Sequence, residues 1–304
     1  MSDRITSDAS RAADVLRHGG IVGMPTETVY GLAALAHDEA AVARVFAVKG
    51  RPRTHPLIVH LPAAAEADRW GRIDDRARAL MLARWPGPLT ILVPRTLHSP
   101  VWVTGGRDTV ALRVPDHALA LELLSLVDDG IVAPSANRFG KVSPTKAEHV
   151  LEDLGVDVDL VLDGGPCGIG LESTIVDCSG EHLQVLRPGA VSAIEIAAVT
   201  GLDLVDPTGE SRAPGMLLSH YAPRAKVVTV ATMEEAREEV AGCEEQGRRA
   251  VILHDTDTRL LAMSLYDRLR EADANGADVV VAVLPPATGI GVAIRDRLAK
   301  ASAD

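Results

Sequence analysis

The chain reads KVVTVA at residues 226–231, AVILH at 250–254 and VVVAVL at 279–284, three apolar runs of the length of a buried strand. Each run is followed by a segment with the residue pattern of a helix. The helices are expected over residues 233–246, 260–274 and 291–301. This strand–helix alternation predicts a small parallel sheet with right-handed crossovers.

The segment before these runs has a different composition. Residues 203–223 hold three prolines and two glycines and show little periodicity, which is typical of a linker. We therefore expect a first domain over 1–202, a linker over 203–225 and a second domain over 226–304.

The first 202 residues alternate apolar runs with helical segments and show no repeat, which predicts a larger α/β domain. Strands are expected at 21–24, 57–61, 89–93, 109–114, 130–133, 160–162 and 173–177. Helices are expected at 7–17, 74–84, 117–127 and 145–154, and from 192 onward, the last two opened by the capping boxes Thr145-x-x-Glu148 and Ser192-x-x-Glu195. Residues 29–48 read as helical in parts, with Asp38 as a cap.

Composition excludes several classes of protein. Of the 304 residues, 47% are hydrophobic and 24% charged, which is typical of globular proteins, and the 3% of aromatic residues predicts an aliphatic core. The net charge of −11 argues against nucleic-acid binding over the whole surface. Three cysteines without metal-binding spacing argue against a disulfide scaffold or a zinc site. No signal peptide or membrane span is visible, so we expect a soluble cytoplasmic protein.

Polar residues cluster in five loops near apolar strands of the first domain, where α/β proteins usually build their sites. The clusters are PTETVYG at 25–31, KGRP at 49–52, DTVALRVP at 108–115, APSAN at 133–137 with SPT at 143–145, and ESTI at 172–175 with LRPG at 186–189. Lysine and arginine beside glycine can bind phosphate, and an arginine inside an apolar strand needs an anionic partner. Taken singly, each cluster is also compatible with a capped turn, a solvated loop or a structural ion pair, and for a Lys/Arg pair such as that at 49–51 the solvated loop is the more common outcome.

The order of these motifs resembles the YrdC family of threonylcarbamoyl-AMP synthases. The Lys-x-Arg and Ser-x-Asn signature of that family matches Lys49, Arg51, Ser135 and Asn137. The chain also resembles the long form of the family. APGM at 213–216 and SHYAP at 219–223 are similar to its interdomain linker, and residues 289–301 are similar to its C-terminal domain.

The resemblance implies a twisted, mixed sheet curved around a concave basic cavity, followed by a small Rossmann-like domain. It also implies that L-threonine, bicarbonate or CO2, and ATP are converted into threonylcarbamoyl-AMP and pyrophosphate. The product would pass to a tRNA threonylcarbamoyl transferase complex, without a membrane partner and without tight tRNA contact. This reaction needs alignment and charge neutralisation more than a covalent nucleophile. Mg²⁺ is expected on the ATP phosphates rather than in a protein metal site.

The family also implies roles for individual residues. The threonine contacts would be Thr26, His60, Arg113, Ala133 and Ser173. The ATP contacts would be Lys49, Arg51, Thr109, Ser135, Asn137, Ser143, Arg187 and Tyr221, with Lys49 and Arg51 also as the catalytic pair. Tyr221, on the linker, would belong to a lid over the nucleotide.

Two other functions are compatible with a YrdC-like domain. The first is a module that binds double-stranded RNA or tRNA without catalysis, against which the net charge of −11 argues. The second is a carbamoyl-transfer enzyme of hydrogenase maturation. Such enzymes carry zinc-finger modules, and the three cysteines here do not have that spacing.

Overall fold

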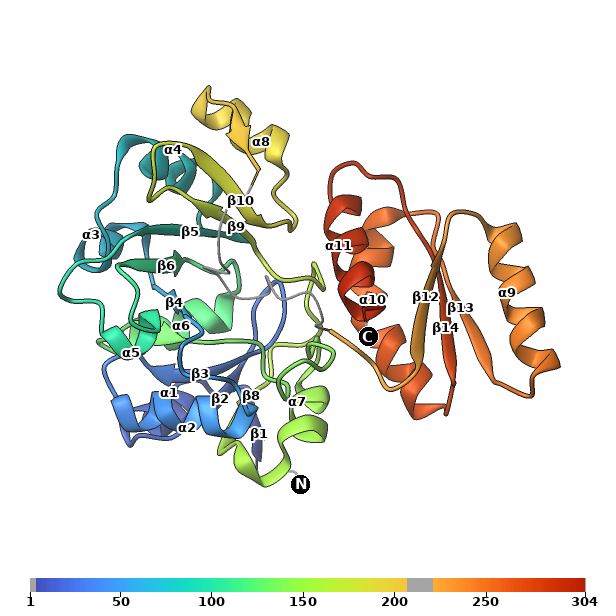
Figure 1. Cartoon of the computed structure of the whole chain (residues 1–304). Helices are drawn as coiled ribbons and strands as arrows, with labels where there is room; N and C mark the ends of the chain where they lie inside the picture. Colours follow the sequence, from blue (N-terminus) through green and yellow to red (C-terminus); the bar gives the residue numbers. More distant parts are fainter. Residues whose placement is uncertain (1–3, 207–220, 304) are drawn as a thin grey trace.

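Two β-sheets organise the computed structural model, which describes residues 4–206 and 221–303 (Figure 1). The larger, mixed sheet has eleven strands in the order β1-β8-β2-β3-β7-β4-β6-β5-β9-β10-β11, and the smaller has three in the order β12-β14-β13. The predicted fold class, a mixed α/β domain followed by a small parallel α/β domain, is confirmed.

The strands of the larger sheet are short. They are β1 (Ile5–Thr6), β2 (Val22–Met24), β3 (Gly31–Leu35), β4 (Ile58–His60), β5 (Leu89–Pro94), β6 (Thr109–Arg113), β7 (Ile131–Val132), β8 (Leu160–Leu162), β9 (Thr174–Asp177), β10 (Leu183–Arg187) and β11 (Leu204–Val205). In the centre of the sheet β4 runs parallel to β6 and antiparallel to β7. The carboxyl ends of β4 and β6 therefore meet, which places His60 beside Arg113 in register.

Helices cover both faces of this sheet. They are α1 (Ala9–Arg17), α2 (Glu39–Lys49), α3 (Ala67–Trp70), α4 (Asp75–Arg84), α5 (Val101–Thr104), α6 (Ala118–Leu126), α7 (Ala147–Leu154) and α8 (Ala193–Thr200). Asp38 caps α2, and Ser192 with Glu195 forms the expected capping box of α8. The core is mainly aliphatic, as the low aromatic content predicts.

The capping box predicted at Thr145 is wrong. Helix α7 begins at Ala147 with Lys146 as its N-cap residue, and no side chain caps it. Glu148 is therefore the second helical residue and not the third, which a capping box requires. The backbone N–H of Thr145 instead donates to Nδ1 of His149, at 3.2 Å.

Four strands of the larger sheet, β1, β3, β10 and β11, were not predicted. Residues 31–35, predicted as helical in part, form β3 between β2 and β7. A short apolar run does not distinguish a buried strand from a helix. The hydrogen bonds offered by neighbouring strands decide between the two, and these come from distant parts of the chain.

The C-terminal sheet confirms the predicted strand–helix alternation. Its strands β12 (Lys226–Val230), β13 (Ala250–Leu253) and β14 (Val279–Val283) are all parallel. Its helices are α9 (Met233–Glu245), α10 (Thr258–Ala274) and α11 (Gly291–Ala301). Helix α9 packs on one face, while α10 and α11 pack on the other, which faces the first domain (Figure 1).

The segment predicted to link the domains starts inside the larger sheet, because β11 pairs with β10. The motif APGM at 213–216, the residues Ser219 and His220, and most of the predicted lid lie outside the described residues. Tyr221 and the residues after it are described. Within the described ranges, no helix is long and apolar enough to cross a membrane.

Candidate active site

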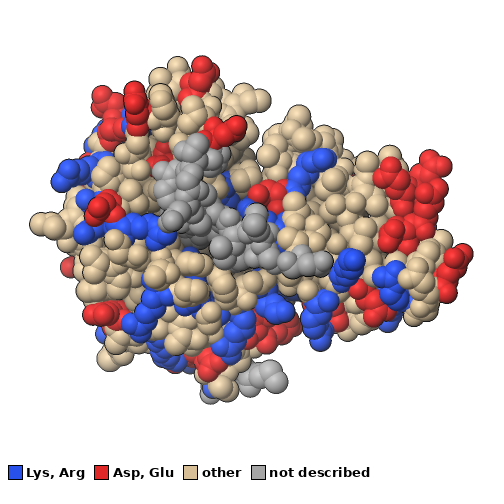
Figure 2. Space-filling model, in the orientation of Figure 1, with Lys and Arg blue, Asp and Glu red and all other residues tan. Residues whose placement is uncertain are grey.

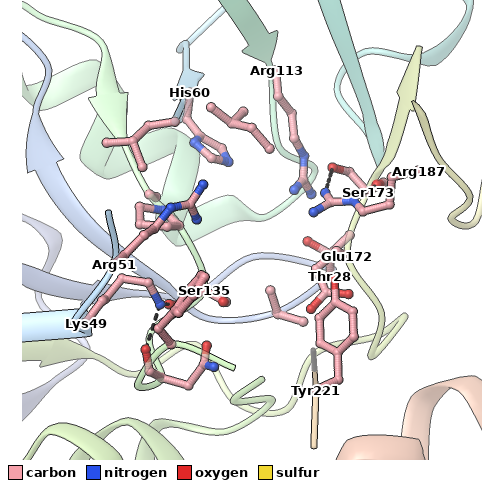
Figure 3. A pocket seen from close by; sticks show the side chains of 17 residues that line it. Thr28, Lys49, Arg51, His60, Arg113, Ser135, Glu172, Ser173, Arg187 and Tyr221 are labelled. Atoms are coloured by element: carbon pink, nitrogen blue, oxygen red, sulfur yellow. Dashed lines mark hydrogen bonds between the residues drawn. The ribbon is translucent and has the colours of Figure 1, made fainter. Parts of the chain in front are cut away.

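A cavity lies against the carboxyl ends of β4 and β6 and encloses about 620 Å³ of space that is partly open to solvent (Figure 3). Its wall comes from segments far apart in the sequence. The lining residues are Thr28, Val29, Lys49, Arg51, Leu57, Ile58, His60, Arg113, Ala133, Pro134, Ser135, Asn137, Phe139, Glu172, Ser173, Arg187 and Tyr221. The larger sheet thus brings residues from all five polar clusters to one place.

Lys49 and Arg51 enter the cavity from the end of α2. Gly50, with φ +66°, ends the helix in the left-handed conformation that glycine adopts without strain. The Lys49 ammonium donates to the backbone carbonyl oxygens of Asn137, at 2.6 Å, and Ser135. Burial, with the nearby Arg51, holds the pKa of Lys49 well below its usual range. A lysine with only neutral carbonyl partners in a buried wall is well suited to bind an anion, whose negative charge favours its protonated form.

The Arg51 guanidinium lies in the same wall, where its Nη2 donates to the carbonyl oxygen of Pro56 at 2.8 Å. Burial, and then the positive charge of Arg187, lower the pKa of Arg51 to about 10. Arg51 therefore remains charged at neutral pH. In Figure 3 it points, with Lys49 and Ser135, toward the open centre of the cavity.

The Ser-x-Asn segment follows β7 and shapes the adjoining wall. The Asn137 amide nitrogen donates to the carbonyl oxygens of Arg138, at 2.9 Å, and Lys141, at 2.7 Å. These bonds fold the loop back on itself. The Asn137 Oδ1 is buried and has no hydrogen-bond partner among the described residues, so it is available as an acceptor.

His60 and Arg113 form a second region of the cavity. Nη2 of Arg113 lies 2.7 Å from a Glu27 carboxylate oxygen, in a geometry that makes no hydrogen bond, and Nε donates to the Gly87 carbonyl oxygen at 3.3 Å. The anionic partner that this strand arginine needs is thus present. Burial, and then Arg113, lower the pKa of His60 to about 3, so its ring is neutral at pH 7. The His60 Nδ1 has no partner within the described ranges.

Ser173 and Arg187 are joined at the facing wall. Arg187 donates from Nη2 to the Ser173 hydroxyl and from Nε to the Ser173 carbonyl oxygen, both at 3.0 Å. The Ser173 hydroxyl also lies 2.8 Å from that of Thr90. These bonds fix the direction of Ser173 and of the arginine at the end of β10.

Glu172 lines the cavity although, within the ESTI motif, it was not selected as a site residue from the sequence. Its carboxylate accepts hydrogen bonds from Ser143, at 2.6 Å, and from Tyr266 and Arg297 of the C-terminal domain, each at 2.9 Å. Burial alone would raise the pKa of Glu172, but Arg297 and then Arg187 hold it at about 2. It is the one carboxylate among the described lining residues, where the cationic ones are Lys49, Arg51, Arg113 and Arg187.

The cavity is therefore basic although the chain is acidic. Helix α9 carries six glutamates, at the far side of the C-terminal domain, where red atoms gather in Figure 2. These six carboxylates thus lie away from the cavity.

Ten of the thirteen predicted site residues line the cavity: Lys49, Arg51, His60, Arg113, Ala133, Ser135, Asn137, Ser173, Arg187 and Tyr221. Three do not. The Thr26 hydroxyl is buried against Thr28 and the Val29 carbonyl oxygen, and Ser143 donates to Glu172. Thr109 is the first residue of β6, four positions before Arg113 and on the same face of the strand.

Comparison with known proteins identifies the family. Residues 14–189 match a family model that covers Sua5, YciO and YrdC and is described as "Telomere recombination", and residues 191–303 match the "Threonylcarbamoyl-AMP synthase, C-terminal domain". The threonylcarbamoyl-AMP synthase of Pyrococcus abyssi is 39% identical, with 96% of this chain and 93% of the relative covered. The chain belongs to this family. The synthase of Bacillus subtilis is also 39% identical, with 96% and 92% covered.

A solved structure extends this likeness to the arrangement of both domains. The crystal structure of P. abyssi Sua5 complexed with L-threonine has a TM-score of 0.92 and 38% identity, and the match covers 97% of this chain and 94% of that one. The prediction of a threonylcarbamoyl-AMP synthase of the long form, a nucleotidyltransferase that acts in tRNA modification, is confirmed.

Proposed function

We propose that the cavity binds L-threonine, bicarbonate and ATP, and that threonylcarbamoyl-AMP and pyrophosphate are formed there. The observation that carries this proposal is the convergence of Lys49, Arg51, Arg113 and Arg187 on one cavity of an acidic chain. Cations of this kind are what a triphosphate and two carboxylate-bearing substrates require.

The reaction needs no covalent enzyme intermediate. The neutral threonine amine attacks the carbon of bicarbonate or CO2 and gives a carbamate, with loss of water in the case of bicarbonate and of a proton to solvent in the case of CO2. A carbamate oxygen then attacks the α-phosphorus of ATP, and the bond to the β-phosphate oxygen breaks as pyrophosphate leaves. Fixed cations that align the two anions and offset the charge of the leaving group accelerate such a step.

We assign the ATP phosphates to the wall of Lys49, Arg51 and Arg187, next to Ser135 and Asn137. Three cations supply charge there. The buried Oδ1 of Asn137 can accept a hydrogen bond from a hydroxyl or amino group of the nucleotide, since the phosphates carry no donor. Tyr221 adds an aromatic ring at the edge of this wall.

We assign threonine to the region of His60, Arg113, Ala133 and Ser173. The Arg113 guanidinium already pairs with Glu27 through Nη2, without a hydrogen bond, so the substrate carboxylate would share this cation with Glu27. Neutral His60 can accept a hydrogen bond from the substrate. The related P. abyssi Sua5 was crystallised as a complex with L-threonine, which supports this choice of substrate.

Three predicted site residues do not line the cavity. We propose indirect roles for Thr26 and Ser143, and a contact farther from the cavity for Thr109. Thr26 supports the turn that presents Thr28 and Val29, and Ser143 orients Glu172. Thr109 is reached only by a ligand that extends from the cavity along β6.

We propose that Mg²⁺ enters on the ATP phosphates. Within the described part of the chain, no group of three or more His, Cys, Asp or Glu side chains is arranged to hold a metal ion. The Glu172 carboxylate is occupied by Ser143, Tyr266 and Arg297. The phosphates themselves are the remaining oxygen ligands for Mg²⁺.

We propose that the enzyme works in the cytoplasm and that its product passes to a tRNA threonylcarbamoyl transferase complex, with at most weak tRNA contact. An assay of pyrophosphate release from ATP and Mg²⁺, with threonine or bicarbonate omitted in turn, tests the synthase reaction. Release should need both. Equal ATP turnover without threonine would reject the reaction and favour a different use of the nucleotide site.

A further inference from the structure

The Glu172 carboxylate is the point where the C-terminal domain reaches the cavity. Arg297, on α11, and Tyr266, on α10, each place a donor 2.9 Å from the same carboxylate oxygen. Both side chains are buried. The other carboxylate oxygen accepts from Ser143, in the loop before α7.

The charges around Glu172 come from several elements. Arg297 contributes from α11, where it also pairs with Asp296 and donates to the Pro188 carbonyl oxygen at 3.1 Å. Arg187 on β10 and, more weakly, Lys49 on α2 add positive charge. Among the described residues, Tyr221 and Tyr266 are further titratable neighbours of Glu172. Lys300 lies beside Asp296 and near Arg297.

An isolated carboxylate in this wall would oppose ATP binding. It would repel the triphosphate and would attract the positive charge of Arg187 that the phosphates require. The salt bridge from Arg297, at 2.9 Å, removes both effects because it supplies a countercharge from outside the lining residues.

The same guanidinium also borders Tyr221, which lines the cavity. It lies 5.1 Å from the centre of the Tyr221 ring, and the Tyr266 ring stacks on Tyr221 with 5.7 Å between the ring centres. Tyr221 has φ +65°, a conformation that residues other than glycine rarely adopt. Contacts from the C-terminal domain therefore hold this ring in place.

We propose that Arg297 is a positioning residue for nucleotide binding: it neutralises Glu172 and keeps the phosphate wall of the cavity positive. The inference rests on the proposed function, since it takes ATP as the ligand of this wall. The C-terminal domain would then act on the nucleotide site through Arg297, in addition to being attached to the first domain.

Docking of the two domains by itself does not require Arg297. Arg270 of α10 forms a separate interdomain ion pair with Asp153 of α7, at 2.5 Å, and also donates to the Val142 carbonyl oxygen. This pair has no contact with Glu172 among the described interactions. Arg270→Met is therefore a matched control, since it removes an interdomain arginine without changing the charge on Glu172.

The test compares four variants of the full chain: R297M, R270M, E172Q and the double variant E172Q/R297M. The KM values for ATP and threonine are measured by pyrophosphate release, and the Kd for ATP is measured directly by calorimetry. R297M should raise KM and Kd for ATP on the order of 10- to 100-fold. The KM for threonine should change only a few-fold, because the zwitterion carries no net charge.

The double variant separates charge from packing. E172Q/R297M should restore the ATP constants to within a few-fold of the parent, because neither charge remains. In R297M, lower pH should also improve ATP binding relative to the parent protein, because Glu172 becomes protonated. If R297M does not fold, as judged by circular dichroism, R297Q replaces it, because glutamine removes the charge and retains a donor.

Three results would overturn the inference: equal losses for R297M and R270M, equal increases in both KM values, or a double variant as impaired as R297M. The Kd measurement needs no turnover. It therefore tests Arg297 even if the parent protein fails to release pyrophosphate, an outcome that would reject the proposed reaction alone.

Discussion

The cavity wall and the domain interface both bury cationic side chains, but they pair them differently. In the wall, Lys49 contacts two carbonyl oxygens and Arg51 one, and neither has a carboxylate ion pair within the described chain. At the interface, Arg270 and Arg297 each contact a carboxylate directly. A buried charge without a counterion destabilises the fold, so its presence indicates an anionic ligand. Interface pairs, in contrast, stabilise the contact between domains.

The strongest test of this contrast is to remove the cations of the wall. Lys49→Ala and Arg51→Ala should each lower the rate of pyrophosphate release on the order of 10²-fold, because each removes one preorganised positive group. The melting temperature should stay close to that of the parent, since no ion pair is lost. Wild-type turnover in either variant would place the nucleotide elsewhere.

The interface should behave in the opposite way. Arg270→Met leaves Asp153 without its partner, and both side chains are mostly buried. The free energy of unfolding should fall by about 2 kcal/mol, between the values for exposed and fully buried pairs. Denaturant unfolding measures this loss, and the rate of pyrophosphate release should remain within a few-fold of the parent. A large loss of activity with unchanged stability would contradict the comparison.

His60 provides a test by pH. Its pKa is about 3 in the folded chain and near its ordinary value of 6.5 when unfolded, so the unfolded state binds the additional proton. The contribution of neutral His60 to the free energy of unfolding is fully present above pH 6.5. It is lost as the pH falls toward 3, by up to about 1.4 kcal/mol per pH unit. His60→Gln should flatten this part of the stability profile in urea titrations at pH 4 to 7. An unchanged slope would mean that His60 titrates normally.

The smallest effect is expected where the interface is exposed to solvent. Lys146 pairs with Asp267 at 2.8 Å, but its side chain is 38% exposed. Lys146→Ala should cost at most about 1 kcal/mol of stability, because water screens such pairs. A decrease of more than about 2 kcal/mol in the free energy of unfolding, measured by chemical denaturation, would show that this exposed pair contributes as much as a buried one. An effect on the KM for ATP would contradict the comparison as well.

Much of the site could be predicted from the sequence because its motifs are contiguous. Lys49 and Arg51 flank Gly50, and Ser135 and Asn137 follow an apolar strand, so the sequence marked them as possible phosphate contacts and the resemblance to the YrdC family selected them. Glu172 was not selected, because a single carboxylate beside hydroxyl residues gives no sign of its partners. Those partners, Tyr266 and Arg297, lie 94 and 125 positions later.

The sequence by itself determined the elements that carry their own boundary signals. Asp38, Asp74 and Ser192 cap the helices that follow them, because a capping side chain bonds to backbone within three residues. The parallel C-terminal sheet follows from the same kind of local alternation.

Only the tertiary structure decided what depends on distant segments. Residues 31–35 became β3 because β2 and β7 offer hydrogen bonds on both sides. Thr145 does not cap α7, because the helix begins two residues later than predicted. The residue before its first turn, Lys146, pairs with Asp267 of the other domain. The charge state of Glu172 was set by an arginine of the other domain. Such pairings join residues that are far apart in the chain, and no local pattern encodes which of them will meet.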